Sequence, residues 1–232
     1  MKYGIGYFIW ILLVPGAATT VHQSGVARVD EPQPASVRIS HDILAENEPL
    51  SLILFDILRG TGVHGGFVEM TGCSDWPKGH LEVKQGTTLR EAMAAVVAAN
   101  PNYQWDLEDD VVNLMPRDGV PLLRTRIAKF QMDATDSEIR IVLQDLLRLP
   151  EVREREAALG LQQGPGQGPG LGVGDIHPVP RQPVPVHINL RNLSLQDAFN
   201  KIVQASPKAV WIYHQTECNG AKTYTVEVVS DY

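Results

Sequence analysis

The sequence predicts an α+β fold of two small domains, each made of paired strand–helix–strand (βαβ) units with the helices on one face of a small mixed sheet. Three observations support it. Four short segments carry apolar residues at helical spacing, extended segments flank them, and two of the helical segments share a residue pattern. A helix this short with one apolar stripe is not stable alone, so each helix must pack on a sheet.

The four helices are predicted from apolar residues at i, i+3, i+4, i+7 and i+8, the spacing that places a stripe on one helix face. The stripes cover residues 50–58, 89–97, 139–147 and 195–203. The residues expected to end the helices are Gly62, Pro101, Pro150 and Pro207. Three helices are expected to begin at a capping hydroxyl, that of Thr88, Ser137 or Ser194.

Extended segments lie on both sides of these helices. Segments 80–84, 126–132 and 187–191 alternate in polarity, and segments 66–70, 103–107 and 210–214 follow helices. Two hairpins are expected, one turning at 108–110 and one at the pair Asn219-Gly220, a residue pair typical of tight hairpin turns. The strand–helix–strand unit is therefore expected four times.

An internal repeat connects two of these units. TTLREAMAAVVAANPNYQW at 87–105 has nearly the pattern of LSLQDAFNKIVQASPKAVW at 193–211. The matched residues include Leu89 and Leu195, Pro101 and Pro207, and Trp105 and Trp211. Equivalent places after equivalent helices favour packing of both tryptophans against their helices. The alternative is a pair of surface aromatics that bind peptide or carbohydrate.

The repeat divides the chain into a first module at 36–118 and a second at 122–230. Residues 160–186 interrupt the second module, with glycine at every second position from Gly164 to Gly174 and four prolines after them. Such a segment loses much conformational entropy on ordering, which indicates a Gly/Pro-rich flexible insertion. Before it, residues 151–157 are expected to form a charged, solvated helical extension.

The first 18 residues are typical of a signal peptide. Lys2 precedes an apolar run from Tyr3 to Val14, and Gly16 and Ala18 occupy the −3 and −1 positions of a cleavage site. The run is short for a spanning helix, which needs about 20 residues. We therefore expect a periplasmic or secreted protein with no stable membrane span after signal removal, the alternative being an uncleaved anchor.

Charge and cysteine content limit the partners and the redox state. The net charge is −7 without a long basic tract, so nucleic acid is not an expected partner. Cys73 and Cys218 are the two cysteines. In an oxidising compartment they can form a disulfide, but the sequence leaves that pairing and two separate thiols equally open.

No motif for catalysis or cofactor binding is found, and we expect no catalytic, cofactor-binding or metal-binding residues and no enzyme activity. The glycines at 164–174 match no nucleotide-binding pattern. The seven histidines lack zinc-site spacing, and the pair His41-Asp42 is weak evidence by itself. The carboxylates at 108–110 suit a solvated hairpin tip.

The helical segments resemble a known family. LSLILFDILRGTGV at 50–63 resembles the N-terminal short domain shared by secretins and TonB-dependent receptors, and VKQGTTLREA at 83–92 is similar to its second half. Residues 126–147 resemble the strand-then-helix unit of secretin N-domains, and 190–211 again resemble the short domain. The resemblance implies a periplasmic interaction module of paired βαβ units, of the kind that forms rings or passes signals to an envelope partner.

These features together lead us to expect an exported, non-catalytic protein-interaction module, acting as an adaptor or accessory in an envelope secretion, pilus or signalling assembly. No long lipid-facing alternation occurs in the chain, so we do not expect a channel. The expected partner is another envelope protein or a second copy. The alternative is a small periplasmic hydrolase or ligand-binding protein with a site at the domain junction.

Overall fold

The computed structural model describes residues 36–73, 78–135, 138–164, 184–206 and 208–229, which lie in one compact unit. The strands are β1 (Ile43–Pro49), β2 (His64–Thr71), β3 (Lys78–Val83), β4 (Tyr103–Glu108), β5 (Val111–Pro116), β6 (Arg126–Thr135), β7 (Leu161–Gln163), β8 (Pro185–Ser194), β9 (Val210–Cys218) and β10 (Ala221–Val229). The helices are α1 (Leu50–Thr61), α2 (Leu89–Ala99), α3 (Ile139–Leu147), α4 (Pro150–Leu159) and α5 (Leu195–Gln204). The predicted α+β class is confirmed, and the predicted signal segment 1–18 lies outside the described residues.

The four predicted helices are confirmed as α1, α2, α3 and α5, and their apolar stripes are buried. Helices α2 and α5 begin at Thr88 and Ser194, each with a reciprocal capping box, in which Glu91 and Asp197 supply the returning carboxylates. The predicted caps therefore hold in both. The third predicted cap, Ser137, is not the N-cap of α3, because that position is taken by Glu138, which makes no side-chain cap bond.

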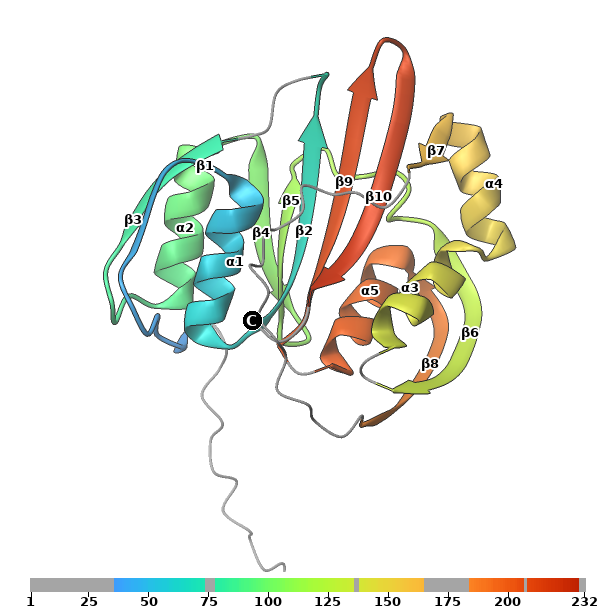
Figure 1. The fold of residues 1–232 in the computed structure, drawn as a ribbon, viewed down its shortest axis with the longest axis horizontal. Coiled ribbons are helices and arrows are strands. Elements are labelled where there is room, and N and C mark those ends of the chain that lie inside the picture. Colours follow the sequence, from blue (N-terminus) through green and yellow to red (C-terminus); the bar gives the residue numbers. More distant parts are fainter. Residues whose placement is uncertain (1–35, 74–77, 136–137, 165–183, 207, 230–232) are drawn as a thin grey trace, which may run out of the picture. The chain divides into compact units, whose positions relative to one another are not determined.

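Six strands form one sheet in the order β4-β5-β2-β9-β10-β7 (Figure 1). Strands β4–β5 and β9–β10 are antiparallel hairpins, whereas β2 is parallel to both β5 and β9, and β7 is parallel to β10. Both hairpins turn at residues with positive φ, Asp109-Asp110 and Asn219-Gly220, as tight two-residue turns require. Two further antiparallel pairs, β1–β3 and β6–β8, lie outside this sheet.

The internal repeat extends over both halves of the chain. Half 1, from β1 to β5, and half 2, from β6 to β10, share the order strand, helix, strand, strand, helix, strand, strand, with α4 as an addition in half 2. In both halves the first and third strands pair antiparallel, the last two form a hairpin, and the second strand lies parallel to the last. The repeated pattern at 87–105 and 193–211 is thus one part of a repeated fold.

The two predicted modules do not have separate sheets. Strands β2 and β9 pair from Gly65–Val210 to Thr71–Thr216, which makes one sheet of both halves. Periodicity predicts the elements of each half but not the partner of an exposed edge strand, so this pairing was missed. An edge strand carries unpaired backbone groups, and the β2–β9 pairing satisfies them for both halves.

The two helix pairs cover opposite faces of the shared sheet. Phe67 and Ile212 belong to the apolar core formed with α1 and α2, whereas their neighbours Val68 and Trp211 belong to the core formed with α3 and α5. Successive residues of a strand point to opposite faces. Each half therefore keeps its helices on one face, as predicted, but the face alternates between halves.

The prediction for residues 151–157 is confirmed in part, and the predicted insertion has different bounds. These residues lie in helix α4, where Arg153, Glu154, Arg155 and Ala157 are exposed, but Val152 and Glu156 are buried. The insertion predicted at 160–186 is narrower, since Leu161–Gln163 form β7 and β8 starts at Pro185. Strand β1, which the sequence analysis did not propose, pairs with β3.

We predict that Gly66→Ala lowers the free energy of unfolding by about 2 kcal/mol, within the range for overpacked cores. A Cβ atom at Gly66 would lie 2.1 Å from Trp211 Cε2. The indole cannot yield easily, because its Nε1 donates to Asn200 Oδ1 at 2.7 Å and its ring contacts Phe199. Gly72→Ala is the control, since a Cβ there meets nothing within 4 Å. Equal urea midpoints for the two variants would contradict the prediction.

Candidate binding site at the sheet edges

Strands β4 and β7 are the outermost strands of the six-stranded sheet, and no described strand pairs with their outer edges. Gly164 N–H donates to Tyr224 O at 2.8 Å. Alternate residues of a strand direct their N–H groups to the same side. The N–H of Gln162 therefore points toward β10, and the N–H of Gln163 points outward. On β4, the bond from Arg117 N–H to Asn102 O directs the N–H groups of Trp105 and Leu107 outward in the same way.

Helix α4 places two charged side chains beside β7. Pro150 occupies its first turn, where a missing N–H costs nothing, and Gly160 ends it in the left-handed conformation (φ 64°). The tight turn at Gly160 brings Leu161, the first residue of β7, back along the helix. Val152 and Glu156 are one helical turn apart and both face inward, so a carboxylate occupies a core position.

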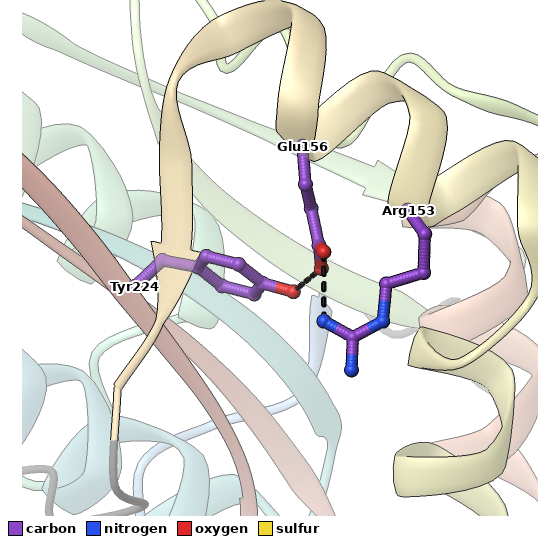
Figure 2. Close-up of polar contacts among 3 residues, drawn as sticks. All are labelled: Arg153, Glu156 and Tyr224. Carbon is purple, nitrogen blue, oxygen red and sulfur yellow. Dashed lines mark hydrogen bonds and ion pairs between the residues drawn. The ribbon is translucent and has the colours of Figure 1, made fainter.

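Glu156 lies at the centre of a buried polar contact shown in Figure 2. Its side chain is 6% exposed, and its carboxylate accepts hydrogen bonds from the Tyr224 hydroxyl and from Arg153 Nη1, the latter at 2.8 Å. Burial, followed by this hydrogen bond, raises the pKa of Tyr224, so its hydroxyl remains a donor at physiological pH. The ring of Tyr224 stacks on that of Tyr213, with 5.5 Å between the ring centroids. The carboxylate is thus held by partners from α4 and β10.

The guanidinium of Arg153 is bonded to Glu156 through one nitrogen, while the side chain remains accessible to solvent. Its bond to Glu156 raises the pKa of the guanidinium, and its side chain is 47% exposed. It borders an open pocket of about 560 Å³. The pocket is lined by Arg153, Glu156, Leu161, Gln162, Gln163 and Gly164. A guanidinium has five donors in a fixed plane, and the bond to Glu156 is made by Nη1.

The other edge strand, β4, carries acidic groups on one face. Tyr103, Trp105 and Leu107 pack against the core formed with α1 and α2, so Asp106 and Glu108 point to the opposite face. Asp106 accepts a hydrogen bond from Asn113 Nδ2 at 2.9 Å. Burial, and then the nearby carboxylates of Asp197, Asp106 and Asp109, raise the pKa of Glu108. Lys201 forms an ion pair with Asp109 at 2.7 Å and acts in the opposite direction, but the carboxylates outnumber it, so this edge has an excess of negative charge.

A ladder of polar pairs crosses the joint between the halves on the α1 and α2 side of the sheet. Glu69 lies beside His214 and Thr71 beside Thr216 in the β2–β9 pairing. The Thr71 hydroxyl lies 3.1 Å from His214 Nε2 and 3.0 Å from Thr216 Oγ1. Two residues further on, Cys73 and Cys218 form a disulfide, so the bond that the sequence left open links the two halves.

Glu69 is an unusual member of this ladder. It is fully buried, and neither carboxylate oxygen has a hydrogen-bond partner within the described structure. Burial raises its pKa from the ordinary 4.5 to about 7, although the nearby Ser51 hydroxyl acts in the opposite direction. Ser51 lies in the first turn of α1, which lacks a side-chain cap and an acidic residue of its own. Glu69 is thus a buried carboxyl beside the first turn of α1.

The residues singled out in the sequence take different places. Trp211 is fully buried beneath α5, and Trp105 is partly buried with Arg90 over its ring at 5.9 Å, so packing is confirmed for both. Asp42 accepts from the N–H of Gln85 at 2.7 Å. The carboxylates at 108–110 are exposed at a hairpin tip as expected. Among the described residues, no three His, Cys, Asp or Glu side chains are grouped to hold a metal ion.

Sequence reasoning missed Arg153, Glu156 and Tyr224. The available signal was the spacing of Val152, Glu156 and Leu159, which follows one helix face with a carboxylate in the middle. Two apolar residues on that face are weak evidence in a segment otherwise rich in charge. The tyrosine partner lies 68 residues further along the chain, beyond any local pattern.

Comparison with known protein families, with curated proteins and with solved structures finds no match for this chain. A search of the described residues for membrane-spanning helices finds none of sufficient length and apolarity.

Proposed function

We propose that this chain is an exported, non-catalytic interaction module of the secretin and TonB short-domain type, which binds an extended segment of a partner along an edge of its sheet. The observation that carries the proposal is the continuous sheet with β4 and β7 at its ends, where β7 lies beside an accessible arginine. Backbone groups at such an edge can pair with an added strand, and neighbouring side chains select it.

Further support comes from the paired βαβ units in each half, which the resemblance implies, and from the disulfide, which suits an oxidising compartment. The segment that fits best at β7 carries a carboxylate, either an acidic side chain or a chain end. Arg153 would meet it with N–H groups that its bond to Glu156 leaves unused.

The alternative, a hydrolase with a site at the junction of the two halves, has its best support in the neighbouring Glu69 and His214 on β2 and β9. Their exposed fractions are 0% and 9%. A substrate would have to open the sheet or lift α1 to reach them, so binding at the edges is the better account.

The test is photo-crosslinking in growing cells. A benzophenone side chain replaces Gln163 at the β7 edge or, as a control, Ile141, which is 49% exposed on α3. We expect an adduct in the envelope fraction for position 163 only, and at least fivefold less of it after Arg153→Ala. Equal adducts at both positions, no adduct at 163, or retention of the chain in the cytoplasm would each contradict the proposal.

A further inference from the structure

We propose that copies of this chain join head to tail, with β4 of one copy adding to β7 of the next in the way that β9 adds to β2 within each chain. This inference rests on the proposed function, because it names the partner that the edges bind. The partner is a second copy, and the contact is heterologous, meaning that two different surfaces meet.

The strands of the two halves correspond one to one. Strand β9 follows the second helix of half 2 and begins its hairpin, as β4 does in half 1. Strand β7 follows the first helix of half 2 and lies parallel to the last strand, as β2 does in half 1. The β2–β9 joint therefore has one unused equivalent, β7 with β4, and these are the two strands at the ends of the sheet.

Strand direction and helix face both reverse between the two halves. Strands β5 and β2 run together and β4 runs against them, and in half 2 the strands β9, β10 and β7 have the reverse directions in the same order. The helices also change face between halves. Half 1 is related to half 2 by a half-turn about an axis that runs across the strands, combined with a shift along that axis. This operation reverses both the strand directions and the face that the helices cover. Such an operation does not close, so applying it again adds further copies.

The two edges carry few of the features that prevent strand addition. Natural sheets protect their edges with charged side chains, above all lysine, with proline, with bulges or with very short strands. Strand β4 reads YQWDLE and β7 reads LQQ, so both strands lack lysine and proline, while β4 has two carboxylates and β7 has three residues. Trp105 and Leu107 on one edge and Gln163 on the other direct backbone N–H groups outward, which allows a parallel pairing like that of β2 and β9.

The charges of the two edges are complementary. Arg153 reaches Tyr224 through Glu156, and Tyr224 packs in the core formed with α3 and α5, so Arg153 lies on that face. Asp106 and Glu108 of β4 point to the same face. Two half-turns relate one copy to the next, so the same face of the sheet continues from copy to copy. The acidic groups of the added β4 would therefore lie on the same side of the sheet as Arg153. The accessible cation would thus meet the carboxylates that crowd one another on β4.

The test uses the purified exported chain and two edge variants in sedimentation velocity. Gln163→Pro removes an outward N–H of β7, and Leu107→Pro removes one of the outward N–H groups of β4, whereas the bonds inside the sheet remain. We expect the mass of the wild type to rise at least twofold with concentration and each variant to stay monomeric. The Gln163→Pro variant keeps an intact β4, and the Leu107→Pro variant keeps an intact β7. An equimolar mixture of the two should therefore form a heterodimer of twice the monomer mass.

A wild type that stays monomeric into the near-millimolar range would overturn the proposal, and so would a variant that dimerises alone or a mixture that gives no heterodimer. If a proline variant fails to fold, hydrogen exchange on the wild type decides. The amides of Gln163 and Leu107 should gain protection together as concentration rises, and unchanged exchange would overturn the proposal. A cellular adduct at 163 to a different protein, with no self-association, would leave the proposed function standing and refute head-to-tail joining.

Discussion

Loss of the Cys73–Cys218 disulfide is expected to lower the free energy of unfolding by about 5 kcal/mol, the chain-entropy value for a loop of this length. The bond closes a sequence separation of 145 residues, so it restricts a large part of the unfolded chain. In the folded chain it lies just beyond the β2–β9 pairing that joins the halves. Its loss therefore also leaves that joint with strand pairing and core packing alone.

The measurement is urea unfolding of the wild type and of the double variant Cys73→Ser/Cys218→Ser, each with and without reducing agent. The reductant should lower the midpoint of the wild type to that of the double variant and leave the double variant unchanged. Cys73 is exposed and Cys218 partly buried, so serine at these places adds little cost of its own. A wild-type midpoint that does not respond to complete reduction would refute the prediction.

Glu69→Gln is expected to stabilise the protein at pH 8 by about 3 kcal/mol and to have little effect at pH 4. The native pKa of Glu69 is raised by burial from 4.5 to about 7, and each pH unit corresponds to about 1.36 kcal/mol. The native state thus holds the proton more tightly than the unfolded state does. Between pH 4.5 and 7 the unfolded state loses its proton first, so stability falls as pH rises through this range.

The quantity to measure is the difference in unfolding free energy between the variant and the wild type, at several pH values from 4 to 8. The difference is needed because burial lowers the pKa values of His64 and His214, which makes the protein less stable as pH falls below about 6.5. These histidines are present in both proteins. Glu154→Gln is a matched control, since Glu154 is exposed on α4. A Glu69→Gln difference that does not change with pH would contradict a buried, titrating carboxyl.

The local elements could be read from the sequence because their causes are local. The stripe of α5, from Leu195 to Val203, shows which side of that helix is buried before any partner is known. Its cap at Ser194 uses Asp197, three residues away. The hairpin at Asn219-Gly220 depends on two residues that adopt positive φ easily.

Elements that owe their form to distant partners could not be read in this way. Strand β7 has three residues and exists because Leu161 to Gln163 pair with β10, about 60 residues further along. Helix α4 has almost no amphipathic pattern, and its orientation depends on the contact between Glu156 and Tyr224. Short segments of this kind carry too little apolar periodicity to be distinguished from loops.

The sequence by itself determined the α+β class, the four amphipathic helices, two of their caps, both hairpins and the likeness of residues 87–105 to 193–211. These depend on side-chain spacing and on turn chemistry within about 20 residues, which a single sequence records directly. The tertiary structure alone decided that the halves share one sheet through β2 and β9, that their helices cover opposite faces, and that Cys73 meets Cys218. It also decided which strands lie at the edges, because an edge is defined by the pairing of all the other strands.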